Sequence, residues 1–190
     1  MRMSVKALLA TTLCLALATA GGPAPATAVA TTRTAPSCGI TWGSGDKAAG
    51  VLSEAPLLVV RTGRDACWDR VVFELDGTAN GYSVRYSAQV PTDGEGVDLV
   101  PYTAGTAFLW VTLLAPAYDA GHTATIDAHT GDHVATVLGY DTLRDVVFGG
   151  SFEGYTTFAV GVRARLPFRV MVLAGPGTHS RIVVDVAHRW

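Results

Sequence analysis

The sequence predicts an all-β fold, an antiparallel β-sandwich formed by one domain, with a partly closed barrel as the alternative. After position 56, apolar and polar residues alternate with a period of two. No long window repeats with the helical period of roughly 3.6 residues. Turns that contain Gly or Pro separate the short apolar segments, as in sandwiches and barrels. A chain of 190 residues is long enough to bury such a core.

The first strands are expected at 57–61, 70–76 and 82–90. Segment 57–61 is a short apolar run, and in the other two every second residue is apolar or aromatic. Asn80-Gly81 lies between the second and third segments. Both residues tolerate the positive φ of a tight turn, so this dipeptide predicts a hairpin that joins 70–76 to 82–90.

The later strands follow the same alternation. They are expected at 107–114, 145–148, 155–164, 168–174 and 181–186. Pro167 and Gly175-Pro176-Gly177 separate the last three segments. Residues 115–142 are the exception, because they form either a long loop or a poorly marked hairpin of 123–128 with 134–138.

The N-terminus has the composition of an export signal. Residues 1–30 combine a basic start at Arg2 and Lys6 with an apolar run at 7–20 and small-residue cleavage sites. Residues 31–37 are expected to form a flexible linker, and 38–190 the folded domain. The apolar run is shorter than the ~20 residues that span a bilayer. We therefore expect a secreted protein, extracellular or associated with the cell wall, with no membrane span after cleavage.

The net charge of −2 averages two unlike parts of the chain. From position 38 onward there are 11 basic and 16 acidic residues, and Lys47 is the only lysine. This balance argues against nucleic acid as a partner. The same segment retains two cysteines, Cys38 and Cys67. In an oxidising compartment they are expected to form a disulfide worth roughly 3–4 kcal/mol, since two cysteines alone do not make a structural zinc site.

The C-terminal strands suggest a face that carries arginines. If 155–164, 168–174 and 181–186 are neighbours, their alternation places four arginines and Asp185 on one sheet face. These arginines are Arg163, Arg165, Arg169 and Arg181. A guanidinium suits the carboxylates and phosphates of envelope polymers. The alternative is that the arginines pair with acidic residues inside the fold.

Two tryptophans and three histidines are the other candidates. Trp42 and Trp68 can stack on sugar rings, or they can pack against the domain. His122, His129 and His133 lie among aspartates, the residue types that hold zinc, but their spacing matches no metalloenzyme motif. We therefore expect no cofactor, and keep the three histidines as weak metal candidates.

Several segments together resemble the AMIN-like domain of exported actinobacterial proteins. They are VVRTGRD at 59–65, CWDRVVFELDG at 67–77, GSFEG at 150–154, VGVRARLPFRV at 160–170 and RIVVDV at 181–186. The similarity covers nearly all of residues 38–190. It implies a β-sandwich without catalytic residues, related to the AMIN domains that target cell-wall amidases to peptidoglycan.

The leading hypothesis is a non-catalytic secreted module that binds peptidoglycan or a related envelope polymer. The first alternative is an interaction module for another exported protein, which requires an apolar patch or an unpaired edge strand. The second alternative is a small hydrolase that uses the 115–142 loop and its histidines.

Overall fold

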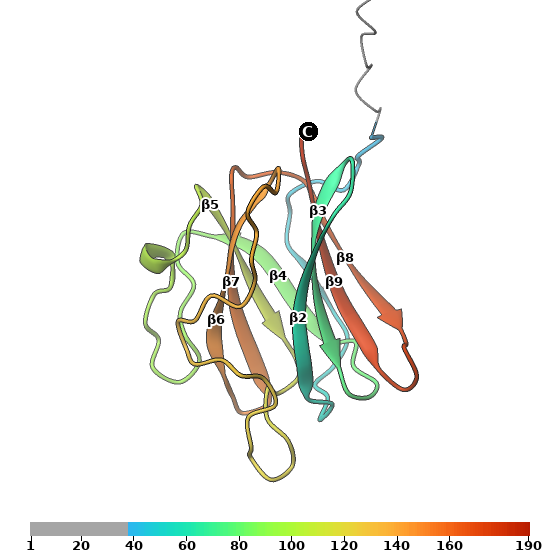
Figure 1. Cartoon of the computed structure of the whole chain (residues 1–190), viewed down its shortest axis with the longest axis vertical. Coiled ribbons are helices and arrows are strands. Elements are labelled where there is room, and N and C mark those ends of the chain that lie inside the picture. The colour runs from blue at the N-terminus through green and yellow to red at the C-terminus, as the bar shows by residue number, and fades with distance from the viewer. Residues whose placement is uncertain (1–37) are drawn as a thin grey trace, which may run out of the picture. The chain divides into compact units, whose positions relative to one another are not determined.

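The structure is a computed structural model that describes residues 38–190, so the predicted signal peptide and linker lie outside the described residues. Two antiparallel sheets form a sandwich, which confirms the predicted fold class (Figure 1). One sheet has the strand order β1-β4-β5-β7-β6 and the other β2-β3-β9-β8. The strands are β1 (Lys47–Ala49), β2 (Leu57–Arg64), β3 (Trp68–Leu75), β4 (Tyr82–Ser87), β5 (Ala107–Leu113), β6 (Leu143–Phe152), β7 (Tyr155–Val162), β8 (Phe168–Ala174) and β9 (Ser180–Ala187). Within these residues no helix is long and apolar enough to cross a membrane.

The core lies between the two sheets and is built from the apolar side of the predicted alternation. Val71, Phe73 and Leu75 of β3 are fully buried. Phe73 meets Phe158 of β7 with ring centroids 4.8 Å apart, which joins the two sheets at their centre. The period-two pattern therefore identified the core-facing side of β3, β4, β7, β8 and β9. Strand β1 was not predicted.

The hairpin predicted at Asn80-Gly81 is wrong, because β3 and β4 belong to different sheets. Both edges of β3 are occupied, by β2 and by β9, so the chain must cross to the other sheet. The Asn80 side chain accepts a hydrogen bond from the backbone N–H of Val51 instead of closing a tight turn. Gly81 passes so close to the Val51 carbonyl that a Cβ atom would lie 2.2 Å from its oxygen.

The prediction of a single face that carries four arginines is also wrong. Strand β7 lies in the five-stranded sheet, whereas β8 and β9 lie in the four-stranded sheet. Arg163 and Arg165 fall in the crossover between β7 and β8, where the chain changes sheets. Only Arg169 and Arg181 remain on strands of one sheet.

Residues 115–142 form a long loop rather than a hairpin of 123–128 with 134–138. Its partly buried apolar residues pack against the core, among them Ile126, Val134 and Val137. Residues 131–134 run along the edge of β6, where Val134 N–H donates to the Val146 carbonyl and Phe148 N–H to the Asp132 carbonyl. The loop therefore closes one edge of the five-stranded sheet.

Candidate functional site

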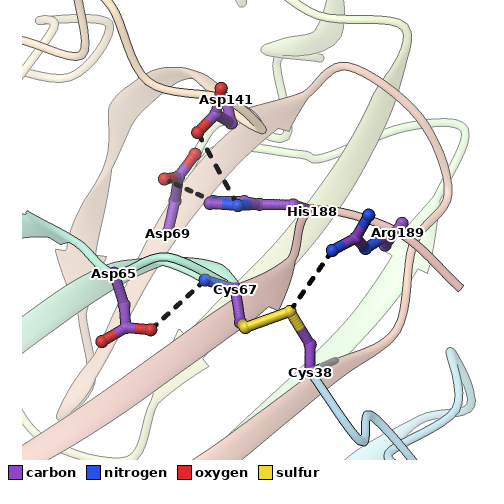
Figure 2. The surroundings of a disulfide bond; sticks show 7 residues. All are labelled: Cys38, Asp65, Cys67, Asp69, Asp141, His188 and Arg189. Carbon is purple, nitrogen blue, oxygen red and sulfur yellow. Dashed lines mark hydrogen bonds and ion pairs between the residues drawn. A yellow bond between two sulfur atoms is a disulfide. The ribbon is translucent and has the colours of Figure 1, made fainter. Parts of the chain in front are cut away.

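The predicted disulfide between Cys38 and Cys67 is present, with its Cα atoms 5.6 Å apart (Figure 2). It attaches the segment before β1 to the residue that precedes β3. This attachment brings Trp42 beside Trp68, with ring centroids 5.7 Å apart. Two residues that lie far apart in the sequence therefore form one aromatic pair on the molecule.

A buried carboxylate holds two arginines next to this pair. Asp185 of β9 stands between Arg70 of β3 and Arg169 of β8 in the strand register. Arg70 donates to its two carboxylate oxygens at 2.6 and 2.8 Å, and Arg169 Nε donates at 2.9 Å. The hydrogen bond to Asp185 raises the pKa of the Arg70 guanidinium. Two guanidinium groups share one carboxylate, so the trio keeps a net positive charge.

The aromatic pair and the charged trio form one continuous surface, which we call the tryptophan–arginine patch: Trp42, Trp68, Arg70, Arg169 and Asp185. The Arg169 guanidinium lies 4.3 Å from the Trp42 ring centroid and 4.9 Å from that of Trp68. These are cation–π distances, and they restrict the arginine's rotamer freedom. Asp185 is fully buried, whereas about 32% of each arginine side chain remains exposed.

The structure thus brings together three of the predicted ligand-binding residues: Arg169, Trp42 and Trp68. The expected alternative, an internal pair with an acidic residue, also holds for Arg169, but it leaves a surplus cation at the surface. Arg70, which completes the patch, was not selected from the sequence. The alternation could have identified it, because Arg70 is next to the core-facing Val71 and therefore lies on the outer face of β3.

The other three candidate arginines lie elsewhere and contact the backbone. Arg163 donates to the carbonyls of Asp141 and His188. Arg165 donates to the Ser44 carbonyl and lies over the Tyr86 ring, and Arg181 donates to the Ala174 carbonyl. Each of these arginines joins segments of the domain.

The three histidine candidates have separate partners. The His122 ring contacts Tyr118, His129 lies 3.5 Å from Asp132, and His133 Nδ1 lies 2.8 Å from Asp145. Within residues 38–190 their ligand atoms do not converge on a common point that could hold a metal ion.

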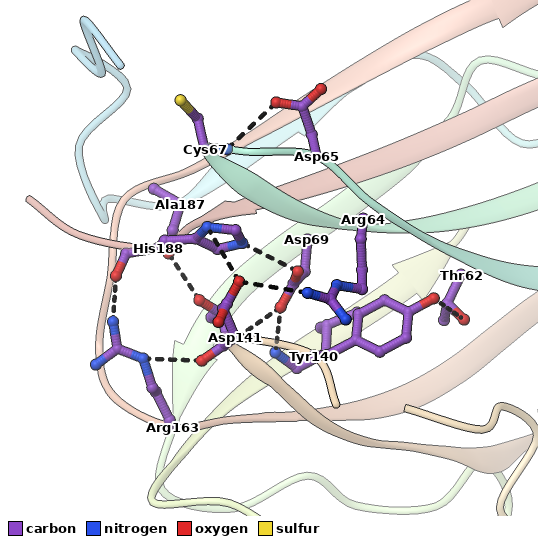
Figure 3. Close-up of polar contacts among 12 residues, drawn as sticks. Thr62, Arg64, Asp65, Cys67, Asp69, Tyr140, Asp141, Arg163, Ala187 and His188 are labelled. Atoms are coloured by element: carbon purple, nitrogen blue, oxygen red, sulfur yellow. Dashed lines mark hydrogen bonds and ion pairs between the residues drawn. The ribbon is translucent and has the colours of Figure 1, made fainter. Parts of the chain in front are cut away.

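A second polar cluster was not predicted and joins the two sheets (Figure 3). Asp69 of β3 is fully buried and accepts hydrogen bonds from the backbone N–H groups of Thr142 and Leu143, where β6 of the other sheet begins. Its other oxygen lies 3.0 Å from His188 Nε2, and His188 Nδ1 lies 3.7 Å from Asp141. We call this group the Asp69 clasp. One signal for it was available: the alternation places Asp69 on the apolar side of β3, with Val71.

The clasp contains ligand types that suit a cation, because oxygen or nitrogen atoms of Asp69, Asp141 and His188 all lie within 4.8 Å of one another. However, the two ring nitrogens of His188 face different carboxylates, and a metal ion binds only one ring nitrogen. His188 Nε2 is hydrogen-bonded to Asp69, and its Nδ1 lies at ion-pair distance from Asp141. The clasp is therefore suited to holding the sheets together.

In a comparison with known protein families, residues 55–188 match the AMIN-like domain. The matched range includes β2 to β9, four members of the tryptophan–arginine patch and the whole Asp69 clasp. No curated protein matches the chain significantly.

Proposed function

Because the chain belongs to the AMIN-like domain family, we propose that it is a secreted, non-catalytic module of the actinobacterial cell envelope that binds peptidoglycan or a related polymer. The family match covers residues 55–188, which form most of the folded domain. The Cys38–Cys67 disulfide fits an oxidising compartment outside the cytoplasm. The export signal predicted in residues 1–30 supports the same location.

The tryptophan–arginine patch is the observation that carries the binding proposal. Aromatic faces stack on sugar rings, and guanidinium groups bind carboxylates such as those of peptidoglycan stem peptides. The domain otherwise carries more acidic than basic residues, so a surplus cation beside two tryptophans is a local exception. Asp185 and the disulfide hold these groups in place before a ligand arrives, which lowers the entropic cost of binding.

Co-sedimentation with insoluble peptidoglycan tests the proposal. We expect Trp42→Ala and Arg169→Gln each to weaken binding by about five- to tenfold, in line with about 1 kcal/mol per cation–π or stacking contact. Arg144→Gln is the matched control, because Arg144 is an exposed arginine on β6 of the other sheet. Wild-type protein that does not sediment would reject polymer binding, and two patch variants that sediment like the control would reject the patch.

The non-catalytic part of the proposal is supported by the separate partners of His122, His129 and His133. It has its own test, in which peptidoglycan is incubated with the protein and soluble fragments are measured. We expect no release above a sample without protein. Release that disappears in His133→Ala would favour the hydrolase alternative.

A further inference from the structure

Strand β2, at one edge of the four-stranded sheet, is open along its middle. In an antiparallel pair the backbone groups of successive residues point alternately toward the partner strand and away from it. Asp65 N–H donates to the Trp68 carbonyl, which sets this alternation for the β2–β3 pair. In the observed register, Arg61 and Gly63 therefore bond to β3, while the N–H and C=O groups of Val60 and Thr62 point away from it.

The chain covers the start of this edge but not its middle. Leu57 N–H donates to the Pro116 carbonyl, and Thr125 Oγ1 donates to the Leu57 carbonyl. Within residues 38–190, no hydrogen bond reaches the backbone groups of Val60 and Thr62 that point away from β3. In contrast, residues 131–134 cover the edge of β6 in the five-stranded sheet and form hydrogen bonds with its backbone. The loop therefore covers the edge of β6 and leaves the edge of β2 open.

A groove of about 690 Å³ runs between this open edge and the loop. Leu58, Val59 and Val60 line one side, and the other side is formed by 125–128 and 132–136. Half-buried apolar side chains, including Ile126 and Val134, face the core beneath it.

The loop side of the groove also carries negative charge. Asp127 and Asp132 are exposed there, and Asp127 makes no hydrogen bond or ion pair with any described residue. The groove therefore combines unpaired backbone groups, apolar side chains among polar ones and a free carboxylate.

We propose that β2 accepts an extended segment of a partner protein as an additional antiparallel strand, with apolar side chains in the groove and a basic residue facing Asp127. Addition of a strand to a sheet edge is a common mode of peptide recognition, in which main-chain hydrogen bonds provide affinity and alternate side chains provide specificity. The proposal concerns a surface separate from the tryptophan–arginine patch and does not depend on polymer binding.

The register determines which residues of the added strand form the hydrogen bonds. Val60 lies opposite Phe73 of β3, and both Val60 and Thr62 face the interior. Residues of the added strand that pair with Val60 and Thr62 therefore direct their side chains into the groove. The apolar residues of the added strand are therefore the ones whose N–H groups bond to β2. The alternate residues point their N–H groups to solvent.

The probe is the synthetic peptide acetyl-Lys-Val-Lys-Val-Thr-Val-Lys-amide, added to the folded protein and followed by NMR. We expect the amides of Val60 and Thr62 to gain protection from hydrogen exchange. Methylating the valine nitrogens should weaken binding at least tenfold, whereas methylating the lysine and threonine nitrogens should change it less than twofold. The amides of Val170 and Val172 serve as an internal control, because they point outward from β8, the other edge of the same sheet.

A charge variant tests the basic residue. Asp127→Lys should weaken peptide binding by about threefold or more at low salt, while Glu95→Lys, an exposed acid away from the groove, should have no effect. Trp42→Ala should leave peptide binding unchanged, which separates this result from the polymer experiment.

Three outcomes would overturn the proposal. The first is no peptide binding, and the second is equal protection of the β2 and β8 amides or equal effects of the two methylation patterns. The third is protection of Val60 and Thr62 in a dimer without peptide, which would assign the edge to a second copy of the chain.

Discussion

At the residue scale, Asp93 is an acid placed where its charge is poorly compensated. One carboxylate oxygen accepts a hydrogen bond from Thr157, and the other is buried without a partner among the described residues. Burial raises the pKa of Asp93 above its ordinary value of 3.8. The folded state therefore binds a proton more tightly than the unfolded chain, and stability falls as the pH rises from below 3.8 through the raised pKa.

We predict that Asp93→Asn increases the free energy of unfolding at pH 7 by about 1 kcal/mol, because the amide removes a buried, unpaired charge. The gain should disappear near pH 3, where Asp93 is protonated in both states. Urea denaturation at the two pH values measures it, with the exposed Asp127→Asn as control. A stability gain that is the same at both pH values would show that ionisation of Asp93 is not its cause.

The predictions for Arg169 and Arg163 differ in outcome, although both were based on alternation along a strand. Alternation predicted correctly that Arg169 and Asp185 lie on the same face, because both strands do belong to one sheet. The same reasoning failed for Arg163, because it follows β7, which belongs to the other sheet, and lies in the crossover after that strand. Local pattern defines the two sides of a strand, but the neighbouring strand is chosen by contacts distant in sequence.

At the element scale, the segment before β1 depends on the disulfide for its position. Residues 38–46 form no strand, and they carry Trp42 to the patch. Cys38–Cys67 attaches the start of this segment to the four-stranded sheet across 29 residues. The cation–π contact with Arg169 and the ring contact with Trp68 then hold the tryptophan in place.

We predict that the double variant Cys38→Ser, Cys67→Ser lowers the free energy of unfolding by about 3 kcal/mol, through greater freedom of the unfolded chain. It should also weaken peptidoglycan binding, because Trp42 loses its attachment. Denaturant unfolding and co-sedimentation measure the two effects. Loss of stability with unchanged sedimentation would show that the disulfide does not position the patch.

The long loop is an element whose position the sequence left open. Its Gly and Pro residues allowed either a hairpin or an irregular path. The irregular path prevails, since residues 131–134 bond to the edge of β6 and Ile126 packs on the core. The loop's role in covering one sheet edge, and in leaving β2 open, depends on that packing.

At the scale of the whole molecule, the Asp69 clasp joins the two sheets at one end of the sandwich. Asp69 belongs to the four-stranded sheet, and the N–H groups that it accepts lie where β6 of the five-stranded sheet begins. Arg163 reinforces the same corner through the carbonyls of Asp141 and His188 (Figure 3).

We predict that Asp69→Ala lowers the free energy of unfolding by about 3 kcal/mol or more, because it leaves two buried N–H groups without an acceptor. Asp69→Asn should cost only about 1 kcal/mol, since its amide oxygen can accept both N–H groups and its NH₂ can donate to His188. Denaturant unfolding compares the two variants. Equal losses would indicate that the negative charge, rather than the accepted hydrogen bonds, joins the sheets.

The all-β class, the core-facing side of β3, β4, β7, β8 and β9, and the disulfide could all be predicted from the sequence alone. Each of these follows from a local period or from the number of cysteines left in the folded segment. The three-dimensional structure was needed to show that β3 and β4 separate and that Arg169 meets Trp42 and Trp68. It was also needed to show that Asp69 joins the sheets and that Val60 and Thr62 leave an open edge. These features arise where segments distant in sequence meet, and period-two alternation carries no information about which strands become neighbours.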